Sequence, residues 1–138
     1  MTIELWYLFL TTVLLTVLWI PYIVGNVRTA GPLRPEEYVN GRNAEFPAWV
    51  RRANRAHINL VEQYGAFAGL VVIAHLTGVH DAVTVWCVIV FFWARVAHAI
   101  IYISGFSQFR ARTVAFSVGF LALLVYAWEI FTNAAPAV

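Results

Sequence analysis

Four long apolar segments constrain this chain more than any other feature, because each is about as long as a lipid bilayer is thick. They run from about residue 5 to 24, 50 to 76, 82 to 104 and 110 to 131. A helix needs roughly 20 apolar residues to cross the hydrocarbon. Only 12% of the residues are charged, whereas about a quarter are charged in a soluble domain. We therefore expect an all-α integral membrane protein, a bundle of four transmembrane helices that forms one domain over residues 1–138.

The distribution of arginine predicts how the helices are oriented. The chain has nine arginines and no lysine, and seven of the arginines lie in or beside two connections, at positions 28, 34, 42, 51, 52, 110 and 112. The two termini and the turn around His80 and Asp81 have none. Because basic residues are enriched on the cytoplasmic side, we expect both basic loops in the cytoplasm and both termini outside. The first span lacks the basic start of a signal peptide, so we expect it to be retained.

Two polar stripes interrupt the apolar segments. Spacings of 3 and 4 residues place side chains on one helical face. The second segment carries such a series at Arg52, Arg55, Asn59 and Glu62, and the third carries Arg95, His98 and Tyr102. Charged groups within a bilayer are costly and usually functional. The two stripes thus predict a cavity that opens toward the cytoplasm.

The residue types of this cavity predict the chemistry of its ligand. Arginine binds carboxylates and phosphates bidentately, and one glutamate can hold an ammonium group. A small, anionic and zwitterionic molecule such as a peptide with a free amine fits this set, and an apolar second substrate can enter from the lipid. Alternatively, Glu62 and Arg95 neutralise each other as a structural pair that meets no ligand.

Other kinds of site have less support in the sequence. The net charge of +2 and the absence of a soluble basic module argue against nucleic acid. The four histidines show no metal-ligand spacing, and Cys87 is the only cysteine, so no metal site is expected. No nucleophile motif of the Gly-x-Ser-x-Gly kind is present.

Two motifs together resemble a known family. The second segment contains Arg55-Ala-His57-x-Asn59-x-x-Glu62, and the third contains Arg95-Val-Ala-His98-x-x-x-Tyr102. They are similar to motifs of the MAPEG family, the membrane-associated proteins in eicosanoid and glutathione metabolism. The likeness extends over nearly the whole chain and includes Gly25-Asn-Val-Arg28 at the end of the first span. The compact form resembles the bacterial branch, which implies a multi-pass protein of the bacterial inner membrane.

The resemblance implies a homotrimer that binds glutathione as cosubstrate between neighbouring subunits. The positions that match glutathione-contacting residues of the family are Arg28, Arg55, Asn59, Glu62, His98, Tyr102 and Phe116. In family members an arginine at the start of the fourth helix lies beside the glutathione sulfur, and two candidates exist here, Arg110 and Arg112. Arg112 is the preferred candidate for the residue beside the sulfur. Thr113 follows it at the position where prostaglandin E synthase, a member of the family, has a serine. Two positions depart from that synthase: Ile58 replaces an arginine, and Phe116 replaces a tyrosine.

The predicted function is a glutathione-dependent transferase or peroxidase that acts on hydrophobic electrophiles or lipid hydroperoxides at the membrane. Its partners would be membrane lipids, glutathione, a hydrophobic small molecule and further copies of itself. One alternative is a non-catalytic lipid-binding or scaffolding trimer. A small transporter is a weaker alternative, because four-span exporters carry an acid in the middle of the first helix and this chain has only Glu4 near its end.

Overall fold

The computed structural model describes residues 1–134 and is all-helical over that part of the chain. Its elements are α1 (Ile3–Leu18), α2 (Ile20–Ala30), α3 (Pro35–Asn40), α4 (Ala48–Thr77), α5 (Ala82–Ser104), the 3-10 turn η1 (Gln108–Arg110) and α6 (Ala111–Asn133). Four helical stretches are long and apolar enough to cross a membrane: Ile3–Ala30, Ala48–Thr77, Ala82–Ser104 and Gln108–Asn133. The expected all-α architecture with four spans is confirmed. The last four residues of the expected domain, 135–138, lie outside the described residues.

The first span is longer than expected and is broken once. We expected it to end near Val24, but α2 continues to Ala30, where Gly31 follows at φ 74°. The break lies at Trp19, two residues before Pro21. Proline lacks an amide hydrogen and its ring clashes with the carbonyl one turn earlier, so it interrupts a helix at this position.

A short helix, α3, lies in the first of the two basic connections, which we expected to be a loop. It begins with Pro35 and carries Glu36 and Glu37 in its first turn, both favourable at a helix N-terminus. The Arg34 amide donates to the Glu37 carboxylate at 2.7 Å. Arg42 then donates to both oxygens of Glu37, at 3.0 and 2.8 Å. These contacts order the loop between the first two spans.

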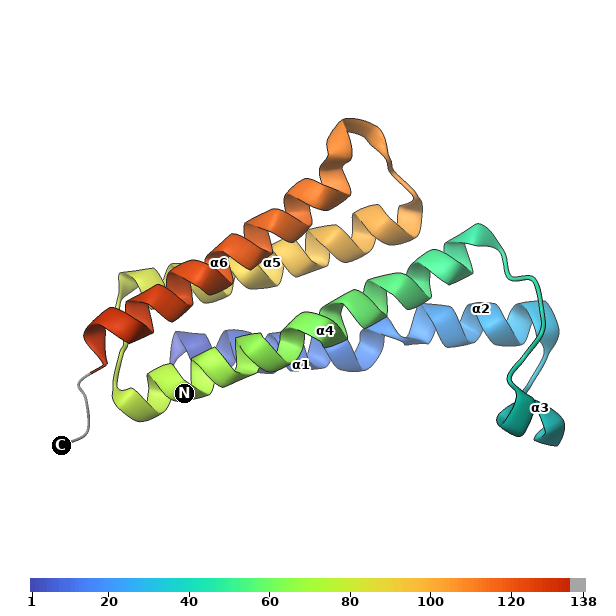
Figure 1. Ribbon diagram of the computed structural model, residues 1–138, viewed down its shortest axis with the longest axis horizontal. Helices are drawn as coiled ribbons and strands as arrows, with labels where there is room; N and C mark the ends of the chain where they lie inside the picture. Colours follow the sequence, from blue (N-terminus) through green and yellow to red (C-terminus); the bar gives the residue numbers. More distant parts are fainter. Residues whose placement is uncertain (135–138) are drawn as a thin grey trace.

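The helices form two antiparallel pairs that pack along their length. The first span lies against α4, while α5 and α6 form a hairpin beside them (Figure 1). Between the pairs lies an apolar core in which Phe67 stacks on Phe91 at 4.2 Å, next to the buried side chain of Tyr126. Both termini lie at one end of the bundle (Figure 1), which we call the termini end. The loop with α3 and the turn between α5 and α6 lie at the opposite end, which we call the arginine end.

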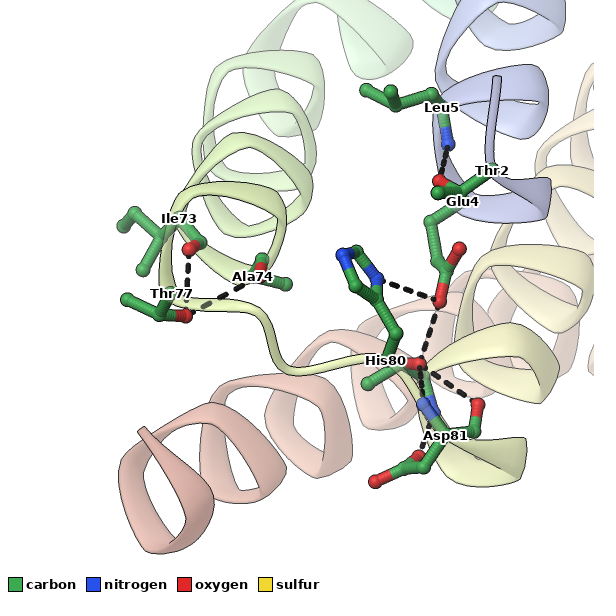
Figure 2. Close-up of polar contacts among 9 residues, drawn as sticks. Thr2, Glu4, Leu5, Ile73, Ala74, Thr77, His80 and Asp81 are labelled. Atoms are coloured by element: carbon green, nitrogen blue, oxygen red, sulfur yellow. Dashed lines mark hydrogen bonds and ion pairs between the residues drawn. The ribbon is translucent and has the colours of Figure 1, made fainter. Parts of the chain in front are cut away.

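The termini end is held by a buried carboxylate. Glu4 is only 3% exposed, and its Oε1 accepts a hydrogen bond from the Thr84 hydroxyl at 2.8 Å. The same oxygen lies 3.4 Å from Nδ1 of His80, and Figure 2 shows the Glu4 carboxylate beside that ring. We call Glu4, His80 and Thr84 the Glu4 cluster. It ties the start of α1 to the start of α5.

Asp81 completes this end of the bundle. Its Oδ1 accepts from the Thr84 amide at 2.9 Å, and the Thr84 hydroxyl accepts from the Asp81 amide at 3.0 Å. This reciprocal capping box ends the α4–α5 turn and begins α5. The hydrogen bond from the Thr84 amide holds the pKa of Asp81 below its usual range.

Candidate functional site

Six of the residues singled out in the sequence line one hollow. Its volume is about 240 Å³, and it lies between α4, α5 and α6; its lining residues are Asn59, His98, Tyr102, Arg112, Thr113 and Phe116. We call it the Arg112 pocket. Helical spacing explains the assembly, because His98 and Tyr102 are one turn apart on α5, and Arg112 and Phe116 are one turn apart on α6.

Aromatic contacts fix the side chains of the Arg112 pocket. The guanidinium carbon of Arg112 lies 4.6 Å from the centre of the Tyr102 ring. The rings of His98 and Tyr102 pack in a T-shaped arrangement with centres 5.5 Å apart, and the centre of the His98 ring lies 6.2 Å from that of Phe116. A cation held over an aromatic face keeps its hydrogen-bond donors free to bind an anion. The pocket therefore combines a positioned positive charge with an apolar wall.

A second guanidinium lies behind the pocket. Arg95 is 2% exposed and donates to the backbone carbonyl of Phe116 at 2.9 Å and to Oδ1 of Asn59 at 3.3 Å. It also lies between the rings of Phe91 and Phe116, at 5.4 and 5.2 Å from their centres. The alternative in which Arg95 and Glu62 neutralise each other predicted an ion pair between them. The structure has no such pair. Arg95 instead joins α5 to α4 and α6 through neutral acceptors.

A second hollow of about 230 Å³ adjoins the first, at the turn between α5 and α6. We call it the turn pocket. Its polar lining includes Arg52 from α4, Arg110 from η1, and Arg112 from α6. Tyr102, Arg112 and Thr113 line both hollows. The two candidates for the arginine beside a bound thiol are thereby separated, since Arg110 lines only the turn pocket.

The remaining predicted contact residues do not reach the Arg112 pocket within one protomer. Arg28 is exposed in the last turn of α2, and Glu62 is exposed near the middle of α4. Arg55 is exposed as well and lines a separate hollow of about 310 Å³ with Arg51 and Tyr22. The stripe on α4 is thus divided between two directions.

The geometry of an α-helix explains this division. A spacing of three residues turns the helix by about 300°, which leaves successive side chains roughly 60° apart. Arg52 and Asn59, seven residues apart, point toward α5 and contact Ile103 and Arg95. Arg55 and Glu62, also seven apart, point about 60° away and are exposed. The sequence pattern predicted a common face but did not distinguish its two edges.

The charges at the arginine end are mostly unpaired. Among residues 1–134, Arg42 is the one arginine that forms an ion pair with a carboxylate, at 2.8 Å from Glu37. Arg52 and Arg51 donate instead to backbone carbonyls, those of Ile103 and Phe46. Guanidinium groups that lie next to a hollow and have no carboxylate partner in this part of the chain favour an anionic ligand. No group of residues suited to hold a metal ion occurs in the described part of the chain.

One residue that supports the site was not singled out in the sequence. Gly119 is buried on α6, and a Cβ atom there would collide with Nη2 of Arg95. The missing side chain makes room for the guanidinium between the helices. A glycine inside an apolar helical segment is the pattern that could have drawn attention to it.

The fold and the pocket define a class of protein: a four-span helical membrane protein with an arginine and aromatic pocket near one end of its bundle. The sequence profile of the MAPEG family matches residues 5–132. The chain therefore belongs to the MAPEG family, which includes membrane-bound glutathione transferases and peroxidases. A search of curated protein sequences gives no significant match.

Proposed function

We propose that this protein is a glutathione-dependent transferase or peroxidase that acts on hydrophobic electrophiles or lipid hydroperoxides within the membrane. Family membership supports a function of this broad kind. The observation that carries the proposal is the Arg112 pocket, where an arginine that pairs with no carboxylate among residues 1–134 lies over Tyr102 beside a hollow. Arg112 is assigned to the thiol, and Thr113 supplies a neighbouring hydroxyl.

The proposed role of Arg112 is electrostatic. A free thiol has a pKa of about 8.5, so little thiolate exists at neutral pH. A guanidinium within a few ångströms favours the charged form, and the surrounding apolar medium strengthens that attraction. The thiolate then forms a carbon–sulfur bond with the electrophile while the leaving group departs with the electron pair. With a hydroperoxide, it attacks the outer oxygen and releases an alcohol, and a second glutathione converts the oxidised sulfur to the disulfide and water.

The proposal includes a homotrimer in which neighbouring subunits complete the glutathione site. Glu62 is exposed near the middle of α4, and a carboxylate that faces lipid at this depth is costly. Gly65, Ala66 and Gly69, exposed on the same helix, are small enough to let another helix approach closely. If a neighbouring subunit packs on this face, Arg55 and Glu62 of one subunit would lie next to the Arg112 pocket of the other. These two residues and Arg28 would then bind the carboxylates and the amine of glutathione.

The orientation is part of the proposal. The arginine end, with its two basic connections, would face the cytoplasm of a bacterium, and both termini would lie outside the inner membrane. Cytoplasmic glutathione would then reach the Arg112 pocket directly, and lipid-dissolved substrates would arrive from the bilayer.

A second candidate function is a non-catalytic lipid-binding trimer. It is favoured by an apolar hollow of about 450 Å³ between α5 and α6, lined among others by Trp86, Cys87 and Leu121. Such a surface can hold an acyl chain without any thiol chemistry.

Calorimetric titration of the purified protein in detergent with glutathione separates the two candidates. The enzyme hypothesis predicts saturable binding, an increase in thiolate absorbance, and turnover of a generic aromatic halide or an organic hydroperoxide. Arg112→Ala should abolish the absorbance change, and the matched control Arg34→Ala, at an exposed loop position, should preserve it. Absence of both binding and thiol-dependent turnover at millimolar glutathione would favour the lipid-binding alternative.

A further inference from the structure

The turn pocket carries more positive charge than the proposed thiol chemistry uses. Arg52, Arg110 and Arg112 all line it, and no carboxylate of the described residues does so. Among residues 1–134, none of the three forms an ion pair with an acidic side chain. Three guanidinium groups around one hollow repel one another unless an anion lies between them. The charge of this hollow thus points to an anionic ligand of its own.

The turn is built to bring these arginines together. Arg52 donates from Nε to the carbonyl of Ile103 at 3.2 Å, and its guanidinium packs against Gly105. A Cβ at position 105 would lie 2.9 Å from Cζ of Arg52, and the φ of 79° also favours glycine there. This contact holds a residue of α4 beside the turn that joins α5 to α6.

The backbone of the turn is strained in the same place. Phe109 and Arg110 have φ values of 54° and 53°, and left-handed conformations of non-glycine residues cost on the order of 1–3 kcal/mol each. Two adjacent residues in this conformation indicate that contacts with the surrounding structure, and not local backbone preference, stabilise the turn. In this conformation Arg110 lines the turn pocket, whereas the Phe109 side chain is 89% exposed.

The position of the turn pocket selects among possible anions. It lies where the spans Ala82–Ser104 and Gln108–Asn133 meet, at the depth expected for lipid headgroups. Phe106 and Phe109 are both exposed on this turn, at 49% and 89%, and exposed phenyl rings beside arginines favour lipid over water. Arginine binds phosphate bidentately, and basic residues next to a span attract anionic lipids.

We propose that the turn pocket binds the phosphate group of an anionic membrane phospholipid, with Arg52 and Arg110 as its principal donors. The acyl chains would lie along Phe106 and Phe109. This site shares Tyr102, Arg112 and Thr113 with the Arg112 pocket, but its proposed principal donors, Arg52 and Arg110, line only the turn pocket. The proposal goes beyond the enzymatic function and holds whether or not the protein reacts with thiols.

The test measures the thermal unfolding of the detergent-purified protein with added phospholipid. Phosphatidylglycerol should raise the unfolding temperature more than phosphatidylcholine with the same acyl chains, and Arg52→Gln should reduce this difference by at least half. The control Arg34→Gln removes the same charge from an exposed position at the same end and should retain the full difference. Equal stabilisation by both lipids, or a full difference in Arg52→Gln, would overturn the proposal.

Further arms identify the ligand and protect against a folding defect. Arg110→Gln should also reduce the lipid difference, and it leaves the Arg52–Ile103 hydrogen bond in place; a full difference in a folded Arg110→Gln protein contradicts the site. Inorganic phosphate alone should give little stabilisation, and an effect equal to that of phosphatidylglycerol would show a free-anion site instead. Saturating glutathione should leave the lipid difference intact, whereas its loss would show that glutathione fills both hollows.

Discussion

The two ends of the bundle treat charge in opposite ways. At the termini end the polar groups satisfy one another: Glu4 accepts from Thr84 at 2.8 Å and lies 3.4 Å from His80, and Asp81 caps α5. At the arginine end, among residues 1–134, Arg42 is the one arginine that has a carboxylate partner. The arginines there without such a partner are Arg28, Arg34, Arg51, Arg52, Arg55, Arg110 and Arg112. Among the described residues, the Arg112 pocket and the turn pocket are lined by arginines and by no carboxylate. The polar groups of the termini end therefore have partners within the protein, whereas the arginines around the pockets of the arginine end can bind a ligand.

This contrast separates stability from function within one small chain. A buried polar group that has its hydrogen bonds stabilises the native packing, whereas an unpaired charge has a cost that a ligand can relieve. Substitutions at the termini end should change unfolding and spare activity. Substitutions in the Arg112 pocket should do the reverse.

The largest expected effect is that of Arg112→Ala on turnover. Under the proposed function, loss of a positioned donor to the developing charge should lower kcat by about 100- to 1000-fold. The unfolding temperature and the oligomeric state should change little, because Arg112 is exposed in the protomer. Steady-state kinetics with an aromatic halide, combined with size-exclusion chromatography, measure both. Arg112→Lys should restore part of the activity, since it keeps the charge but not the fork. Activity that survives Arg112→Ala would show that another residue stabilises the thiolate.

The next effect is that of Glu4→Ala on stability. Removing the carboxylate leaves the Thr84 hydroxyl without this acceptor, and we expect a loss of about 1–3 kcal/mol in the free energy of unfolding. Glu4→Gln should lose less, because an amide oxygen still accepts from Thr84. Glu36→Ala, which removes an exposed acid, is the matched control. Thermal unfolding in detergent measures the difference. A Glu4→Ala protein as stable as wild type would mean that the Glu4 cluster does not hold α1 to α5.

The sequence predicted the arginine end better than the termini end, for a physical reason. Hydropathy and arginine placement are properties of single segments, so four spans and two basic connections could be inferred without coordinates. His98 with Tyr102 and Arg112 with Phe116 are one turn apart, and helical spacing suffices to group each pair. The Glu4 cluster joins residues that are 76 and 80 positions apart. No periodicity reveals such contacts, and His80 had shown no partner in the sequence.

Other features were missed because they depend on three-dimensional packing or on weak local preferences. The division of the α4 stripe follows from which neighbour each edge meets, and a repeat of 3 and 4 residues does not contain that information. The break at Trp19 and the short helix α3 had local indicators, Pro21 in one case and Pro35 with two glutamates in the other. A polar segment rich in proline nevertheless has no apolar face that would predict a helix.

Gly119→Ala tests the region between the two ends, where Arg95 joins three helices. A methyl group there would displace the Arg95 guanidinium from the Phe116 carbonyl, to which it donates at 2.9 Å. Overpacking costs typically 1–3 kcal/mol, and alanine recovers nearly 1 kcal/mol of helix propensity, so we expect a net loss of about 1 kcal/mol. Thermal unfolding against the exposed control Ser117→Ala measures it. A stabilised Gly119→Ala protein would show that Arg95 moves aside freely.

The smallest effect concerns the one arginine of the arginine end that is already paired. Hydrogen bonds lower the pKa of Glu37 from 4.5 to about 2. Those from the Arg42 side chain have the largest effect, and the one from the Arg34 amide has the second largest. A lowered pKa means that this carboxylate orders the loop fully above pH 4.5 and loses its contribution as the pH falls toward 2. Limited proteolysis with pepsin should therefore leave the loop intact near pH 4.5 and cleave it near pH 2.

Glu37→Gln sharpens this last comparison, because it removes the charge at every pH. The variant loop should be cleaved throughout the acidic range, whereas Glu36→Gln, which alters an exposed neighbour, should behave as wild type. Identical cleavage of all three proteins would show that the Glu37–Arg42 pair does not order the loop. If the pair does hold, Arg42 remains bound to Glu37 and to the carbonyls of Gly31 and Pro32, at 2.9 Å each. It is then unavailable to an incoming anion, and the ligand of the arginine end must be bound by the arginines around the two pockets.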